Sequence, residues 1–509
     1  MVRLMCVVLS LVCAVVAPGQ TSPPDGPRPL WGDLVPGDHG VGFRSFWSLD
    51  HGRTYTRPES GLPASEKFPR PVLVNIWYPA ARTDAAPMPH GAYLNIGPSD
   101  ERLDQLATDL AAYALDVISE ESLRAPIEDL DAEARARLDA LLATPTAAVR
   151  EAPPAAGAFP LVLYHAGYGS SFEDNAVLCE FLASHGYVVV GSAFLEGDGG
   201  SFNIDAERDS EEDLEYLVRL ARETLGIDWH RVAMVGHSGG AHTAVRFISR
   251  TSSPLDAMVS LDTTQDYHSF SDHRWDDMVP GALDRAEEID IPLMFAARQH
   301  ALFRMADRLT ASRRTYITLA DLEHNSFISQ GVFAAEMTED PKAAAVRSGY
   351  SELCRAVRLF LDSELVGSES AQSALATRWA GSAPGASPVF LERVAAGESV
   401  PEYDDESGLP PTPARWPRCS TAASPRGRAS CWSGSGTNLG PGRLPRRSSR
   451  SRWSSSWCTR TVRRRLRRCW TVSRPNGVRF SASSVLWSRC TAASARPGWP
   501  SPTPRWFGH

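Results

Sequence analysis

A serine in a glycine-rich segment is the strongest chemical signal in this chain. Residues 236–240 read Gly-His-Ser-Gly-Gly, follow the apolar run Val232–Val235 and precede a helix-like stretch. A strand, a sharp turn and a helix in this order are typical of a G-x-S-x-G nucleophile elbow. Only small neighbours fit beside a serine in such a turn, which is the role we assign to Gly236 and Gly240. The pattern predicts Ser238 as a nucleophile, next to the positive end of the following helix.

A nucleophilic serine needs a base that takes its proton. His324 stands just after the last predicted strand, Thr315–Leu319, in a loop where strand ends gather near the elbow. We therefore predict His324 as the base. The other candidates precede the serine, lie in the helix after it, or stand on loops that spacing does not exclude; they are His165, His237, His242, His268, His273 and His300.

The histidine in turn needs an acid that orients it. Asp262 follows the strand Met258–Leu261 and precedes His324, which gives the order serine, acid, histidine. The end of the next strand, a more usual place for the acid, offers no carboxylate before Asp307. We predict Asp262 as the acid, with Asp266 as the alternative.

A second glycine-rich loop, residues 164–169 (Tyr-His-Ala-Gly-Tyr-Gly), follows an earlier predicted strand. In this arrangement one oxyanion donor comes from such a loop and one from the residue after the nucleophile. The predicted donors are the backbone N–H groups of Tyr168 and Gly239. The alternative is that the loop is a plain tight turn.

The elements that must position these residues alternate along the chain. From Phe159 onward, short apolar runs alternate with helical segments, which predicts a mostly parallel sheet with helices on both faces. Residues 100–143 carry helical spacing and are predicted to be an inserted helical pair. The predicted domain covers residues 20–366, and the Ser-, Ala-, Gly- and Pro-rich residues 367–414 are predicted to be a linker.

The start of the chain resembles a targeting segment. Arg3 precedes the apolar run Leu4–Ala17, and residues 17–19 (Ala-Pro-Gly) offer a small-residue cleavage site. This predicts a signal peptide over residues 1–19 and a secreted or periplasmic protein, with a short membrane anchor as the alternative. No internal run of the sequence is long enough to span a bilayer.

Charge divides the chain into two unlike parts. Residues 415–509 contain 20 Arg and no Lys, Asp or Glu, so the rest has 32 basic residues against 60 acidic ones. The acidic part is expected to avoid nucleic acid and anionic membranes. The tail is interpreted as an out-of-frame reading of GC-rich DNA, or else as a basic arm that binds polyanions, and disorder is expected in either case. Without the predicted signal peptide, the acidic part has two cysteines, Cys179 and Cys354, and the sequence leaves open whether they are bridged.

Several segments together resemble the platelet-activating-factor acetylhydrolase-like branch of the dienelactone hydrolase superfamily, over roughly residues 30–366. The segments that carry this resemblance are Trp77-Tyr78-Pro79-Ala80, the loop His165–Gly169, Ala183–Val188 (Ala-Ser-His-Gly-Tyr-Val), the elbow, Leu261-Asp262, and His324 with Phe327. The chain departs from the family at Gly239, where the family often has a larger residue, and at Ala166, where it often has a histidine.

The resemblance implies an α/β-hydrolase fold and metal-independent hydrolysis of short acyl esters. The expected protein is a secreted serine esterase with a small-molecule ester substrate, no cofactor and no metal. A peptidase or amidase variant and a non-catalytic binding protein on the same fold are the alternatives. Residues 263–283 and the insertion are expected to line the mouth of the pocket. The acyl-chain preference and the oligomeric state stay open.

Overall fold

A computed structural model describes residues 28–55, 68–97, 100–195, 207–224, 228–250, 252–267, 279, 283–298, 301–377 and 389–398. The contacts divide the chain into one unit up to residue 410 and a second over residues 411–509. All of the second unit, and the predicted signal peptide, lie outside the described residues. No helix among the described residues is long and apolar enough to cross a membrane.

The core of the first unit is a ten-stranded sheet in the order β10-β9-β8-β7-β6-β4-β5-β2-β1-β3. The six strands from β5 to β9 in this order are parallel, whereas β2 runs antiparallel to both β5 and β1, and β10 runs antiparallel to β9. The strands are β1 (Gly40–Tyr55), β2 (Phe68–Ala80), β3 (Ala148–Arg150), β4 (Pro160–His165), β5 (Val188–Gly191), β6 (Asp228–His237), β7 (Ala257–Leu261), β8 (Leu293–Arg298), β9 (Arg314–Leu319) and β10 (Val389–Val394). This is the α/β-hydrolase fold, and the prediction of a mostly parallel sheet is confirmed.

Helices pack against the two faces of this sheet. The helices are α1 (Asp104–Leu123), α2 (Ala132–Ala143), α3 (Ala176–Ser184), α4 (Glu207–Thr224), α5 (Gly239–Ile248), α7 (Arg304–Arg308), α8 (Ser329–Met337), α9 (Ala343–Leu361) and α10 (Glu369–Thr377). Val162 and Val235 belong to a core cluster with α3 and α9, whereas Leu163 and Met234 belong to a second cluster with α4 and α5. Successive strand residues point to opposite faces, so both faces of these strands are buried and apolar.

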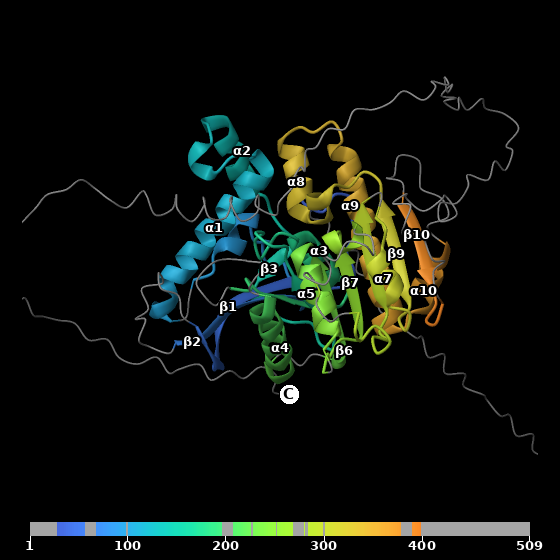
Figure 1. Cartoon of the computed structure of the whole chain (residues 1–509). Helices are drawn as coiled ribbons and strands as arrows, with labels where there is room; N and C mark the ends of the chain where they lie inside the picture. Colours follow the sequence, from blue (N-terminus) through green and yellow to red (C-terminus); the bar gives the residue numbers. More distant parts are fainter. Residues whose placement is uncertain are drawn as a thin grey trace, which may run out of the picture. The chain divides into compact units, whose positions relative to one another are not determined.

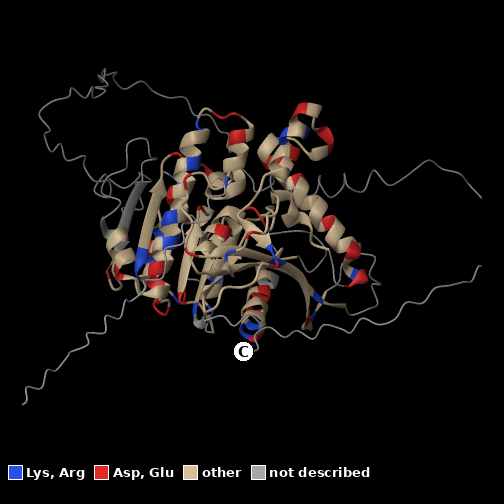
Figure 2. Ribbon diagram, turned by 180° about the vertical axis from the view of Figure 1, so that it is seen from behind, with Lys and Arg blue, Asp and Glu red and all other residues tan. Residues whose placement is uncertain are grey.

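The predicted insertion, residues 100–143, contains α1 and α2, which stand at one end of the sheet near α8 (Figure 1). Leu106, Leu110 and Ala114 of α1 pack with Phe172 and with Leu195 beyond β5. Because Phe172 closely follows the glycine-rich loop of residues 164–169, α1 lies beside that loop. The helix carries five acidic side chains and no Lys or Arg (Figure 2).

Part of the predicted linker is ordered, so the prediction for residues 367–414 is wrong over two segments. α10 packs on α9 and buries Ala371 and Leu375, which share one helical face. β10 pairs with β9 from Val389 to Val394 and forms one edge of the sheet (Figure 1). The segment is rich in small residues, so its sequence did not indicate these two elements. Only two apolar residues mark the buried face of α10, and β10 is held by backbone pairing.

Cys179 and Cys354 are both free thiols in the structure. They lie fully buried in the same core cluster, on α3 and α9. Burial raises the pKa of both thiols, that of Cys354 to about 12. Both therefore behave as buried apolar groups rather than as reactive thiols.

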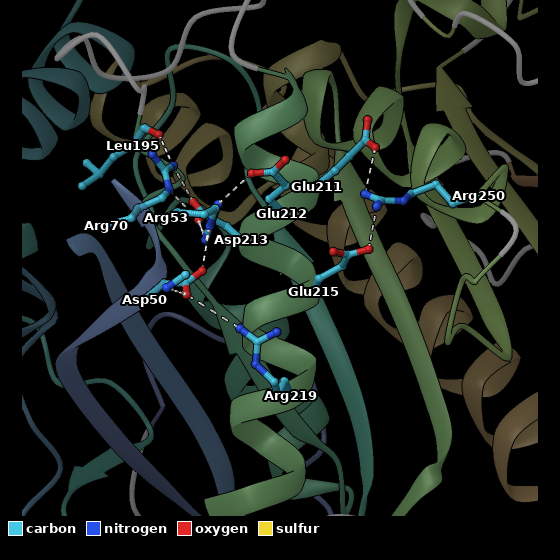
Figure 3. A network of polar contacts seen from close by, with 11 residues as sticks. Asp50, Arg53, Arg70, Leu195, Glu211, Glu212, Asp213, Glu215, Arg219 and Arg250 are labelled. Carbon is cyan, nitrogen blue, oxygen red and sulfur yellow. Dashed lines mark hydrogen bonds and ion pairs between the residues drawn. The ribbon is translucent and has the colours of Figure 1, made fainter. Parts of the chain in front are cut away.

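Buried charges fix α4 to the hairpin of β1 and β2 (Figure 3). The guanidinium of Arg70 in β2 binds Asp213 of α4 through Nε to Oδ1 and Nη2 to Oδ2, both at 2.7 Å. Arg53 of β1 binds the same carboxylate at 2.7 Å, and Arg70 also donates to the carbonyl of Leu195. The side chains of Arg70 and Asp213 are each only 2% exposed.

We expect Arg70→Met to destabilise the protein by about 3–5 kcal/mol, because Asp213 would stay buried with one of its two partners removed. The measurement is urea unfolding followed by circular dichroism. Arg219→Met is the matched control, since Arg219 is 56% exposed and lies 3.8 Å from Asp50 at the same hairpin. Its removal is expected to cost less than about 1 kcal/mol. Equal losses from both variants would contradict the prediction.

Candidate active site

The turn between β6 and α5 has the backbone of a nucleophile elbow. Ser238 has φ 53° and ψ −117°, outside the region that most residues adopt, and α5 begins at the next residue. A Cβ on Gly236 would lie 2.3 Å from the carbonyl oxygen of Gly240, and a Cβ on Gly240 would lie 2.2 Å from that of His165. Neither position can hold a side chain, so both glycines are required for this turn.

The structure brings Ser238, His324 and Asp262 together. The Oγ of Ser238 is 2.9 Å from Nε2 of His324, and Nδ1 of His324 is 2.7 Å from Oδ2 of Asp262. The serine follows β6, the aspartate follows β7, and the histidine begins the short 3₁₀ helix His324–Phe327 (η6) after β9. The side chain of Asp262 is fully buried, whereas the side chain of His324 is 35% exposed. The hydrogen-bonded chain therefore runs from a buried carboxylate to a histidine that is partly exposed to solvent.

The surroundings of Asp262 keep it ionised. Burial alone would raise its pKa, but hydrogen bonds from His324, Tyr267 and the Arg298 amide outweigh burial and lower the pKa of Asp262. Its Oδ1 accepts the backbone N–H of Arg298 at 2.9 Å and the hydroxyl of Tyr267. The carboxylate is thus fixed from one side by these donors and presents Oδ2 to the histidine.

The alternative acids do not reach His324. The carboxyl of Asp266 accepts the backbone N–H of Thr263 at 3.3 Å and is buried. Burial and the nearby charge of Asp262 raise the pKa of Asp266 well above its ordinary value. Asp307 accepts the hydroxyl of Tyr316 at 2.8 Å.

The alternative histidines that the structure describes are bound elsewhere. His165 stacks on Phe194, with ring centroids 3.8 Å apart, and a ring nitrogen of His242 lies 2.9 Å from Oγ1 of Thr264. His237 donates its Nε2–H to the backbone carbonyl of His324 at 3.1 Å. Burial, together with the neighbouring His324, lowers the pKa of His237 to about 3, so it stays neutral. His268, His273 and His300 lie outside the described residues.

The predicted oxyanion loop is a tight turn against the elbow. Ser170 donates its backbone N–H to the carbonyl of Gly167 at 3.1 Å, and Gly169 has φ 72°, which a glycine adopts without strain. The ring of Tyr168 covers Gly239, because a Cβ there would lie 2.1 Å from Cδ2 of that ring. The two predicted donor residues are therefore in contact. The absence of a side chain at Gly239, a departure from the resembled family, makes room for this ring.

The residues Glu173, Asp174 and Asn175 were not predicted as part of the site. They directly precede α3, which begins at Ala176. The three side chains are buried and bond to neighbouring segments instead of continuing the helix. Their signal in the sequence is three consecutive polar residues before an apolar helix, directly after a glycine-rich loop.

Comparisons with known proteins find two similarities. The family model described as chlorophyllase matches residues 127–268, which include the loop of residues 164–169, the elbow and Asp262. The chain is similar to chlorophyllase over this stretch. A solved ferulic acid esterase from Streptomyces cinnamoneus is 18% identical, with a TM-score of 0.45 over 69% of this chain and 96% of that chain. No curated protein matches the sequence. The resemblance to platelet-activating-factor acetylhydrolases stays a prediction.

Proposed function

We propose that this protein is a serine hydrolase that cleaves carboxylic esters with short acyl groups through an acyl-enzyme. The observation that carries the proposal is the hydrogen-bonded chain from Ser238 through His324 to Asp262 at a strained elbow. The stretch similar to chlorophyllase supports it, since it covers three parts of the same site. No step of the proposed chemistry needs a metal or a cofactor.

In the proposed mechanism, Nε2 of His324 takes the proton of Ser238 as Oγ attacks the ester carbonyl carbon. Asp262 holds the histidine with its Nδ1–H toward Oδ2 and stabilises the imidazolium that forms. The electron pair of the carbonyl moves onto its oxygen, which the N–H groups of Tyr168 and Gly239 receive. Gly239 is the first residue of α5, and the first amides of a helix have no acceptor within it. The histidine then protonates the leaving alcohol, and water releases the acid by the same route.

Two features support a small, uncharged acyl ester as the substrate. The ring of Tyr168 covers the residue next to the nucleophile, which narrows the space for the acyl group. α1 lies beside the oxyanion loop with five acidic side chains and no basic one, which disfavours anionic substrates. Most of residues 263–283, expected to line the mouth of the pocket, lie outside the described residues.

The test is turnover of p-nitrophenyl esters of increasing acyl length, together with labelling by a fluorophosphonate probe. We expect the shortest acyl chains to react fastest and the probe to label Ser238. Matched p-nitroanilides separate an esterase from an amidase, because only an amidase would cleave them at a comparable rate. A protein that is neither labelled nor active would instead be a binding protein on this fold.

We also propose export of the protein, on the signal-peptide pattern of residues 1–19. N-terminal sequencing of protein recovered outside the cytoplasm tests it. A mature chain that begins near Gln20 supports export, and retention of residues 1–19 on cytoplasmic protein contradicts it.

A further inference from the structure

The buried carboxylate of Asp174 accepts hydrogen bonds from both ends of the oxyanion loop. One oxygen accepts the hydroxyl of Ser170, the last residue of the loop turn, and the other accepts the hydroxyl of Tyr164 at the end of β4, both at 2.6 Å. The backbone amide of Gly167 lies close enough to lower the pKa of this carboxyl. The loop that carries Tyr168 is thus bonded at both of its ends to one side chain.

The same residue also holds the segment that follows His324. The carbonyl of Asp174 accepts the backbone N–H of Gln330 at 3.0 Å and the hydroxyl of Ser329 at 2.9 Å. The neighbouring Asn175 accepts the backbone N–H of Ser329 through Oδ1 at 3.2 Å. These contacts fix the start of α8, which directly follows the 3₁₀ helix that begins at His324.

We propose that Asp174 is a positioning residue that sets the oxyanion loop and the base segment relative to each other. The proposal rests on the ester-hydrolase function above. Asp174 lies behind the loop, and it would act on the reaction through the placement of the Tyr168 amide. The residue adds a second, independent buried carboxylate to the site beside Asp262.

The chemistry of the site requires an acceptor at Asp174. Ser170, Tyr164 and the Gly167 amide all offer protons to it, so a carboxylate satisfies every one of them. Burial raises the pKa of Asp174 to about 6, which still leaves it ionised at neutral pH. An asparagine would turn its NH₂ group toward one of these donors, and that contact would be lost.

Glu180 offers a matched control on the same helix region. It is as deeply buried as Asp174, and its carboxylate accepts the hydroxyl of Tyr93 at 2.6 Å and the indole N–H of Trp31 at 2.7 Å. It bonds neither to the oxyanion loop nor to the base segment in the described contacts. Asp174→Asn and Glu180→Gln therefore each replace a buried carboxyl group by an amide, and only the first of these groups touches the site.

The first measurement is steady-state hydrolysis of p-nitrophenyl acetate. We expect Asp174→Asn to lower kcat about ten- to a hundredfold and to leave KM within about twofold, because a displaced oxyanion donor affects the transition state more than the bound ester. Glu180→Gln should keep kcat within about twofold of the wild type. Ser170→Ala should lower kcat by a smaller factor, whereas Ser171→Ala, whose hydroxyl bonds Glu173, should not.

The second measurement is inhibition by a short alkyl trifluoromethyl ketone. Oγ of Ser238 adds to the ketone carbon, its proton passes to His324, and the carbonyl electron pair becomes an oxyanion in the hole. In Asp174→Asn the affinity for this ketone should fall by the same factor as kcat/KM. A merely structural role would not couple these two losses, since partial unfolding lowers the active fraction and leaves the inhibition constant unchanged.

The third measurement, hydrogen exchange, does not depend on activity. Amides in residues 164–172, which the side chain of Asp174 holds, should exchange faster in Asp174→Asn and not in Glu180→Gln. Residues 324–332 are held by the backbone carbonyl of residue 174, which this substitution keeps, so their exchange should change less. A wild-type protein without esterase activity would overturn the proposed function, while exchange would still decide on the positioning role. The role is overturned if Asp174→Asn exchanges normally in residues 164–172, retains kcat, or loses no more kcat than Glu180→Gln.

Discussion

Ser238→Ala is expected to lower ester hydrolysis by roughly 10⁶-fold, the loss typical of a removed triad nucleophile. The missing Oγ is the atom that attacks the ester, and no other hydroxyl in the described part of the chain bonds to Nε2 of His324. The measurement is kcat for p-nitrophenyl acetate, with labelling by a fluorophosphonate probe in parallel. Far-UV circular dichroism should be unchanged, because alanine keeps the backbone of the turn.

His324→Ala should lose activity to a similar extent, because members of a triad act as a unit. His185→Ala is the control for the removal of a histidine, since His185 ends α3 and bonds to the carbonyl of Val35. That variant should retain wild-type kcat. Substantial turnover by Ser238→Ala would exclude the proposed serine mechanism.

Asp262→Asn is expected to lower kcat by about 10⁴-fold, as for the best-studied triad. Arg298 and Tyr267 both donate to Oδ1, so the amide oxygen of an asparagine would be held on their side. Its NH₂ group would then face Nδ1 of His324 and force the proton onto Nε2. In that tautomer the histidine cannot accept the proton of Ser238, whereas KM should change much less.

Asp266→Asn is the matched control for this substitution. The pKa of Asp266 is raised well above its ordinary value, which disfavours its charged form, and the oxygen of an amide can accept the backbone N–H of Thr263 in the same way. Wild-type kcat is expected for Asp266→Asn in the p-nitrophenyl acetate assay. A collapse of activity in this variant, with Asp262→Asn close to wild type, would show that Asp266 and not Asp262 is the acid of the triad.

The sequence was most informative where a local pattern has a local cause. The glycines of the elbow are required by contacts within five residues or with the adjacent strand, so the motif alone located the turn. The parallel strands were visible because both of their faces are buried, which makes them continuous apolar runs. Ser238, Asp262 and His324 could be predicted as a group because each follows a strand, and the carboxyl ends of parallel strands lie at the same edge of the sheet.

Interactions between distant segments could not be predicted in this way. Asp174 contacts Ser329, 155 residues further along the chain, and nothing in its immediate neighbours indicates this. Helix α10 and strand β10 were missed for a related reason. Leu375 becomes a core residue only through packing against α9, and β10 is specified by pairing with β9 rather than by its own composition.

Strand β10 also determines where the chain can be truncated without exposing an unpaired sheet edge. β9 is buried along its whole length, and β10 pairs with its outer edge. A protein cut near residue 366 would leave the backbone N–H and C=O groups of that edge unpaired, and an open edge of this kind is a template for a second molecule. Such a protein should associate through its sheets and come out of solution, although its triad would be intact. A protein that ends after Ala414 keeps β10, so the outer edge of β9 stays paired.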